Sequence, residues 1–387
     1  MRANPGGLIN PEETIGRDLL IRAIWRRLEN QSVLLTSERR IGKTSVIRKM
    51  RQACPPKDFC VLRDIEGLHS PGEFIESIHA DLEPVLTLAE KAKQKFLKAL
   101  EALGGIQVKD VKIPTFQPHW KSLLIAIIAD AAEAHKGRLV LFWDEMPLFI
   151  YNVAKMCGET EAMVLLDTLR SIRQSFPTVR MVFTGSVGMH QVVHSLRNAG
   201  YANAPTNDMA IMEVPALTPE DGKTLATALI EGEGMKPVGK IEDIAMKISE
   251  CSSNIPFYIH TLVARIHDES DEIDQQSVID HVEKLITDPN DPADFGYYEK
   301  RIGTYYQNND AQVARTILDI VSGSTSPLNF KDIFNRINHT TGEYSEEQCR
   351  TIIETLIKDH YIHKLRNTTI CFKYMIVEKW WRFARGS

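Results

Sequence analysis

The segment from residue 33 to residue 50 restricts the fold more than any other part of the chain. It contains the letters VLLTSERRIGKTSVIRKM, with an apolar run first, a polar loop next and an amphipathic stretch last. This order predicts a strand, a loop and a helix, and a loop that ends in Gly-Lys-Thr in that setting is typical of phosphate binding. Loop N–H groups and the positive end of the helix attract anions. The segment therefore predicts an α/β sheet with a nucleotide site.

Three residues of this loop have distinct expected roles. Gly42 lets the backbone approach a phosphate closely, Lys43 would reach the β- and γ-phosphates, and Thr44 would place its hydroxyl on Mg²⁺. The usual pattern begins with glycine where this chain has Ser37. That first glycine mainly eases the turn at the end of the strand, so we expect a serine there to leave a working site.

Two acidic residues end the apolar strand predicted over 138–145, about 100 residues after the loop. Asp144 can hold Mg²⁺ through water, and Glu145 can polarise the attacking water in ATP hydrolysis. Both would lie at the edge where parallel sheets bind ligands. Thr184 and Ser186 follow a later strand, and either of them could sense the γ-phosphate. The sequence does not choose between these two, and turn chemistry beside the intervening glycine is an equal alternative.

Strands alternate with helices as far as residue 217, which predicts a doubly wound parallel sheet. Strands are predicted at 33–36, 59–65, 138–145, 179–185 and 212–217. Helices are predicted at 18–29, 71–86, 120–135 and 158–175. We assign 1–217 to a P-loop NTPase core with an insertion at about 82–118, in which 88–103 is expected to be helical and 106–114 to be β.

The strand pattern ends at Leu217, and a different organisation begins. Thr218 to Asp221 form a capping box with proline at the first helical position. Four helices are predicted up to about residue 286, so 218–290 is expected to be an all-α helical lid. Residues 287–298 have the composition of a linker.

The last part, 300–387, is expected to be a winged-helix domain. Helices are predicted at 310–322, 329–337 and 345–359, followed by two alternating strands around a polar turn at Asn367 and Thr368. Helix, helix, helix and hairpin is the order of a winged helix.

The distribution of charge gives arguments both for and against DNA binding. The net charge of −5 supplies no general attraction to nucleic acid. Residues 361–387, however, carry six Lys or Arg against one acid, and Trp380 and Trp381 among them could stack on bases. The predicted helix 345–359 is rich in acids, which phosphates would repel. A protein-contact module and a DNA binder that uses Lys364 and Arg366 therefore both remain open.

The cysteine pattern and the hydropathy of the chain indicate in which cellular compartment the protein is expected. The six cysteines are scattered without a CxxC pair, so we expect neither a disulfide framework nor a zinc site. The opening residues lack the pattern of a signal peptide, and no apolar run is long enough to span a bilayer. These features favour a cytoplasmic protein without a membrane partner.

Several motifs resemble those of the STAND class and the archaeal-type ATPases, which are relatives of AAA+ proteins. The matching stretches are IGRDLLIRAIWRRL at residue 15, SERRIGKTS at 37, LVLFWDEMPLF at 139, VFTGSVGMHQVV at 182, VPALTPED at 214, SSNIPFYIHTL at 252, and the C-terminal DHYI and FKYMIVEKWWRFARG. Where the family tends to have a glycine two residues before the lid proline, this chain has Asn254. The likeness covers most of the chain outside the insertion.

The resemblance implies which residues contact ATP. Ile15, Gly16 and Arg17 would lie by the adenine, and Pro256 would lie near the base. Phosphate contacts would come from the loop residues Ser37, Arg39, Arg40, Ile41, Gly42, Lys43, Thr44 and Ser45. For Arg39 and Arg40, contact with a neighbouring subunit is the open alternative.

The resemblance also implies a nucleotide-dependent switch, in which ATP sets the angle between core and lid and so controls self-association or a partner protein. Hydrolysis can be slow in such proteins, and in related oligomers an arginine from a neighbouring subunit reaches the γ-phosphate. Candidates for that arginine are Arg170, Arg173 and Arg197, although a solvated helix charge is the favoured interpretation of each. The alternatives are an ATP-dependent DNA-binding ATPase, such as a loader or a transposition or defence regulator, and a scaffold that binds nucleotide without turnover.

Overall fold

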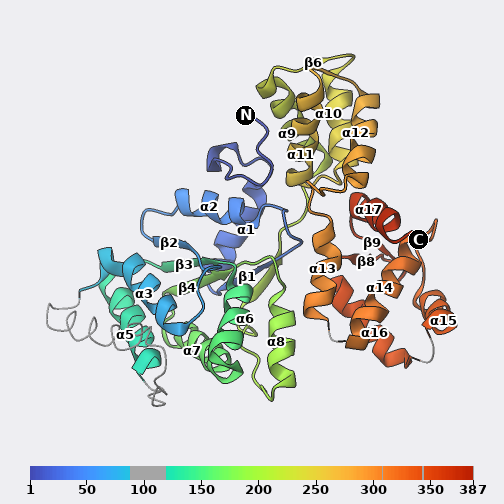
Figure 1. Ribbon diagram of the computed structural model, residues 1–387. Coiled ribbons are helices and arrows are strands. Elements are labelled where there is room, and N and C mark those ends of the chain that lie inside the picture. Colours follow the sequence, from blue (N-terminus) through green and yellow to red (C-terminus); the bar gives the residue numbers. More distant parts are fainter. Residues whose placement is uncertain (88–118, 307, 342–343, 387) are drawn as a thin grey trace, which may run out of the picture. The chain divides into compact units, whose positions relative to one another are not determined.

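The computed structural model describes residues 1–87, 119–306, 308–341 and 344–386 (Figure 1). The chain divides into two compact units. The sheet unit consists of Arg17–Arg39 and Lys43–Val214, and the helical unit consists of Met1–Gly16, Arg40–Gly42 and Pro215–Ser387. The predicted helix and β segment of the insertion lie outside the described residues.

A five-stranded parallel sheet forms the centre of the sheet unit, as the sequence predicts. Its spatial order is β2-β3-β4-β1-β5. The strands are β1 (Val33–Thr36), β2 (Phe59–Asp64), β3 (Leu139–Asp144), β4 (Val179–Phe183) and β5 (Ala210–Glu213). Because β4 lies between β1 and β3, the ends of three strands that are distant in sequence are neighbours in space.

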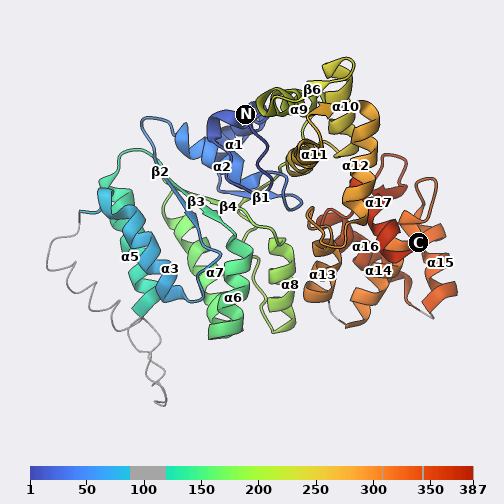
Figure 2. The same cartoon turned by 45° about the horizontal axis from the view of Figure 1, so that its top comes forward.

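Helices cover both faces of this sheet (Figures 1 and 2), with α1 and α2 on one face and α3, α5, α6, α7 and α8 on the other. Successive side chains of a strand point to opposite faces, and β3 follows this rule. Phe142 packs edge-on against Trp25 of α1, and Trp143 packs against Phe74 of α3. Every residue of β3 is buried, which explains its continuous apolar sequence.

The helices of the sheet unit largely follow the sequence pattern. They are α1 (Asp18–Leu28), α2 (Lys43–Gln52), α3 (Pro71–Leu82), α5 (His119–Ala134), α6 (Met146–Cys157), α7 (Glu159–Ser175) and α8 (Met189–Asn198). Ser70 caps α3 by accepting a hydrogen bond from the Glu73 N–H. The sequence analysis missed α6 and α8. The helix pattern of α6 follows directly on the strand, and Gly158, with a φ of 101°, separates it from α7.

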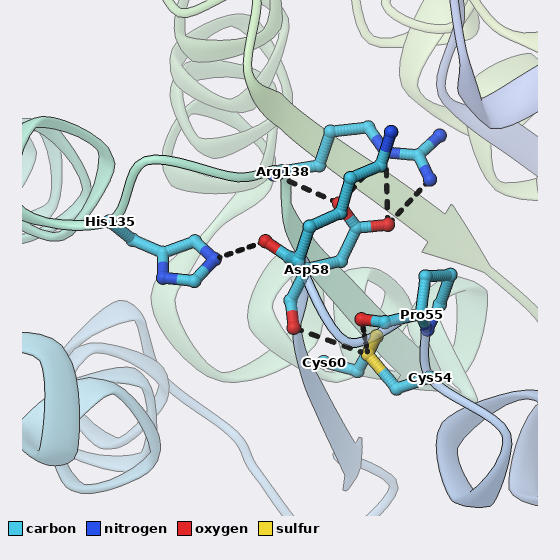
Figure 3. The surroundings of a disulfide bond; sticks show 7 residues. Cys54, Pro55, Asp58, Cys60, His135 and Arg138 are labelled. Carbon is cyan, nitrogen blue, oxygen red and sulfur yellow. Dashed lines mark hydrogen bonds and ion pairs between the residues drawn. A yellow bond between two sulfur atoms is a disulfide. The ribbon is translucent and has the colours of Figure 1, made fainter.

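One cysteine pair corrects the expectation of unpaired thiols. Cys54 lies in the turn after α2, Cys60 lies in β2, and the two form a disulfide (Figure 3). The turn reverses the chain, so a spacing of six residues brings the two sulfur atoms together. The same turn buries the Asp58 carboxylate, which pairs with the Arg138 guanidinium. Each of the remaining cysteines is a free thiol.

The segment of the helical unit that starts at Pro215 begins with four helices, as predicted. A 3-10 turn, η1 (Pro11–Glu13), belongs to its N-terminal segment. The four helices are α9 (Pro219–Glu233), α10 (Ile241–Cys251), α11 (Pro256–Glu269) and α12 (Gln275–Thr287). Thr218 caps α9 by accepting from the Asp221 N–H, which is the N-cap half of the predicted capping box. The Asp221 carboxylate accepts from the Thr218 hydroxyl. Two short parallel strands, β6 (Lys236–Pro237) and β7 (Glu272–Ile273), were not expected there.

The last part of the helical unit contains helices and a hairpin in the predicted order. The elements are α13 (Gly296–Tyr305), α14 (Asn308–Ser322), α15 (Phe330–Thr341), α16 (Glu346–Lys358), β8 (Ile362–Lys364), β9 (Ile370–Phe372) and α17 (Met375–Arg385). The β8–β9 pair is antiparallel, and Leu328 forms a bridge to Ile370 beside it. The predicted linker is shorter than expected because α13 begins inside it, and α17 was not predicted.

Candidate phosphate-binding site

The loop at residues 37–42 connects β1 to α2, which is the predicted setting for phosphate binding. Lys43 is the first residue of α2, so the N–H groups of the first turn face the loop side. Arg40 and Gly42 have φ angles of 65° and 98°. Backbone with positive φ next to helical residues turns successive N–H groups into a concave anion site.

The ammonium group of Lys43 is held by oxygen atoms of the loop itself. Its Nζ donates to the carbonyl oxygens of Ser37 (3.1 Å) and Glu38 (2.8 Å) and lies 3.3 Å from the Ser37 hydroxyl. The side chain of Ser37 thus makes a contact that the glycine of the usual pattern lacks. The sequence analysis did not single out Glu38, which is fully buried and accepts a hydrogen bond from the Arg39 N–H.

Asp144 joins the ends of two strands to the start of α2. Its Oδ2 accepts a 2.6 Å hydrogen bond from the Thr44 hydroxyl, and its Oδ1 accepts one from the Thr184 hydroxyl. Asp144 ends β3, and Thr184 follows β4, the neighbouring parallel strand. The predicted carboxylate and the predicted loop threonine therefore meet although 100 residues separate them.

Glu145 lies beside Asp144 but has a different partner. Its Oε2 accepts hydrogen bonds from the backbone N–H (2.9 Å) and the hydroxyl (2.8 Å) of Ser186. Burial raises the pKa of the Glu145 carboxyl above its usual range, and the two bonds from Ser186 oppose that rise. A carboxylate with a raised pKa accepts a proton more readily near neutral pH. The structure thus gives Thr184 and Ser186 separate partners where the sequence did not choose between them.

The donor atoms at this edge suit Mg²⁺. A carboxylate oxygen of Asp144 and the hydroxyl oxygen of Thr44 lie 2.6 Å apart, and Mg²⁺ in nucleotide sites typically takes one or two protein oxygens together with phosphate oxygens and water. No group of three or more His, Cys, Asp or Glu side chains arranged for a metal occurs within the described ranges. These residues therefore fit a metal that is bound mainly by its nucleotide.

The remaining predicted nucleotide contacts fall in both units. Arg17, which is buried, and Ser45 of α2 belong to the sheet unit. The helical unit contains Ile15, Gly16, Arg40, Ile41, Gly42 and Pro256. Their role in binding the nucleotide stays a prediction.

The arginine candidates differ in their surroundings. Arg173 is buried, and its guanidinium donates to the Asp208 carboxylate at 2.8 Å. This pairing gives Arg173 a structural role within the sheet unit. Arg197 is exposed near the end of α8, and Arg170 is half-buried in α7.

Both C-terminal tryptophans and two of the nearby arginines make contacts within the helical unit. Trp381 is fully buried and donates its indole N–H to Asp319. Arg385 donates to the same carboxylate at 3.0 Å, and Arg382 donates to the Ser322 carbonyl. Trp380 is buried as well, so neither tryptophan is available to stack on bases.

Membrane insertion finds no support in the described helices, since none combines the length and apolar composition that crossing a bilayer requires.

No family model and no curated protein sequence matches this chain. Among solved structures, the chain is similar to a Walker-type ATPase of Pyrococcus abyssi, with 16% identity over 96% of this chain and 97% of that chain and a TM-score of 0.64. It is also similar to the ORC2 protein of Aeropyrum pernix in its ADPNP–ADP complexes, with 11% identity over 99% and 96% of the two chains and a TM-score of 0.51. At these identities the likeness shows the fold alone, a parallel α/β sheet followed by a helical C-terminal region.

Proposed function

We propose that this protein binds ATP with Mg²⁺ and hydrolyses it at the carboxyl edge of the parallel sheet. The observation that carries the proposal is the hydrogen bond between Thr44, at the start of α2, and Asp144, at the end of β3. It brings together the Thr44 hydroxyl and the Asp144 carboxylate, two oxygens that suit Mg²⁺, beside the half-buried Glu145.

Each residue of the site has a defined task in this reaction. Loop N–H groups and Lys43 would hold the phosphates, for which Lys43 exchanges its carbonyl partners for phosphate oxygens. Thr44 and Asp144 would hold Mg²⁺, which when bound neutralises charge on the phosphates. Glu145 would orient the attacking water and accept its proton, and Ser186 fixes the position of the glutamate carboxylate.

Two substitutions test the site. Glu145→Gln keeps size and hydrogen bonding but removes the base, so phosphate release should fall by about a hundredfold or more while ATP affinity is retained. Lys43→Ala should abolish measurable ATP binding in equilibrium dialysis. Unchanged phosphate release in Glu145→Gln would refute the assignment of the base. Binding without any turnover in the unmodified protein would favour a nucleotide-binding scaffold.

We further propose that the nucleotide state controls self-association or a partner protein, with 218–290 as a lid and 300–387 as a winged-helix domain. The division of the chain supports this, because the chain passes from the sheet unit to the helical unit at Arg40 and returns at Lys43. A change in loop conformation therefore acts on both units through the covalent chain. Light scattering with and without ATP tests the idea, and a mass and shape independent of nucleotide would contradict it.

DNA binding is the second candidate function, and one observation favours it. Lys364 and Arg366, at the tip of the β8–β9 hairpin, are exposed and form no ion pair with any residue of the described ranges. DNA should then stimulate ATP turnover, with a steep dependence on salt that Lys364→Ala and Arg366→Ala reduce. Turnover that is indifferent to DNA at low salt would exclude this candidate.

A further inference from the structure

Arg40 has a conformation that phosphate binding alone does not explain. Its φ of 65° is a left-handed backbone that residues other than glycine rarely adopt. Two contacts inside the helical unit hold its side chain. The guanidinium donates to the Asp294 carboxylate at 2.9 Å, and its central carbon lies 3.8 Å above the ring of Phe257.

The turn that carries Asp294 is itself fixed. The carboxylate of Asp291 accepts hydrogen bonds from the N–H groups of Phe295 and Gly296, each at 2.7 Å, and thereby caps the start of α13. Asp291 and Asp294 both have positive φ, so the turn has a defined shape. The backbone of the turn that carries Asp294 is therefore held by hydrogen bonds that do not involve Arg40.

The other contact of Arg40 is continuous with the aromatic core of the helical unit. Phe257 packs on Tyr258, which stacks on Phe295 with ring centroids 5.0 Å apart. Phe295 in turn stacks on Trp380 of α17 at 6.0 Å. Arg40 is thus bound to a packed row of rings that extends to the C-terminal helix.

A second attachment joins the same region of the lid to α17. The Ile376 N–H, in the first turn of α17, donates to the Ser253 hydroxyl at 3.1 Å. Ser253 belongs to the turn just before α11, the helix that carries Phe257. The contacts of Arg40 therefore reach a part of the helical unit that is joined to α17 by ring packing and by a hydrogen bond.

We propose that Asp294 and Phe257 hold Arg40 in its left-handed conformation, and that phosphate affinity at the loop is thereby coupled to the turn at 291–296. The loop N–H groups that follow Arg40 can form a concave anion site only while this conformation lasts. Coupling between two sites is reciprocal, so bound phosphate stabilises the turn as the turn stabilises the phosphate site. This inference rests on the proposed nucleotide site and describes its regulation.

Two substitutions of Arg40 isolate the backbone effect. Arg40→Ala and Arg40→Gly both remove the guanidinium, so any direct contact between that group and phosphate is lost equally. Glycine adopts positive φ without steric cost, whereas alanine does not. ATP should therefore bind about tenfold more weakly to Arg40→Ala than to Arg40→Gly. Equal affinities would overturn the proposal.

A matched pair of aspartates tests the contact from the other side. Asp294→Ala removes the partner of Arg40, while Asp288→Ala removes a carboxylate of the same connecting segment that pairs with Arg265 instead. ATP with Mg²⁺ should slow amide hydrogen exchange at Phe295 and Gly296 in the unmodified protein. Asp294→Ala should lose this protection and bind ATP several-fold more weakly, and Asp288→Ala should do neither. Equal effects of the two substitutions would overturn the proposal.

The nucleotide-free protein separates failure of this inference from failure of the proposed function. If the unmodified protein does not bind ATP, the proposed function fails. Amide exchange at residues 41–44 then decides whether Asp294 holds the loop. Faster exchange there in Asp294→Ala than in Asp288→Ala would support the proposal that Asp294 fixes the loop conformation through Arg40. Equal rates would refute it.

Discussion

The carboxyl edge of the sheet and the C-terminal helix both contain residues with predicted functional roles, but the contacts of these residues differ. At the sheet edge, Asp144 and Glu145 lie together with the polar residues expected to work with them. In α17, by contrast, Trp381, Arg382 and Arg385 are engaged in packing and hydrogen bonds within their own unit. Parallel strands end at a common edge, so residues at strand ends converge. The number of cations along a helix, in contrast, does not predict where their side chains lie or what they contact.

The largest expected effect tests the structural role of α17. Trp381→Ala removes a fully buried side chain and its hydrogen bond to Asp319, so the free energy of unfolding should fall by about 3–5 kcal/mol. Urea denaturation measures this loss. Phe383→Ala, at a 57% exposed position of the same helix, is the matched control and should have little effect. A similar unfolding midpoint for both variants would mean that Trp381 is not a core residue.

A smaller effect is expected from the disulfide in the sheet unit. Reduction of the Cys54–Cys60 bond opens a short loop, which should lower the free energy of unfolding by about 2 kcal/mol. Alkylation under denaturing conditions without a reductant should modify four cysteines, and six after reduction. Cys157→Ser, which removes an exposed free thiol, serves as the control. Six modified cysteines before reduction would contradict the pairing.

The smallest expected effect is a change in the pH dependence of turnover, and it tests the separate roles of Thr184 and Ser186. Ser186→Ala removes a hydroxyl that bonds to the ionised Glu145 and lowers its pKa, so the pKa of that carboxyl should rise further. The base works only when it is deprotonated, so the acidic limb of the turnover profile should move to higher pH. Thr184→Ala, whose hydroxyl bonds to Asp144 instead, should leave the position of that limb in place. A limb that moves equally in both variants would contradict the separate roles of Thr184 and Ser186.

Much of the site could be predicted because its residues sit at element boundaries that sequence marks clearly. The apolar strand before Asp144 and the polar loop before Lys43 are both local patterns, and the structure confirms each element. The helices α6 and α8 were missed because each begins close behind a strand, where the change of period has few residues in which to appear. The disulfide was missed because six residues of spacing do not reveal a chain reversal.

The amino-acid sequence by itself determined the strand–loop–helix unit, the parallel sheet, the change to helices after Leu217 and the order of elements to the hairpin. These features follow from local periodicity, capping and turn chemistry, which act over a few residues. Only the tertiary structure decided that β4 lies between β1 and β3, that Thr184 bonds to Asp144 while Ser186 bonds to Glu145, and that Arg40 is held by Asp294. Such pairings depend on which distant segments become neighbours, and packing of the whole unit decides that.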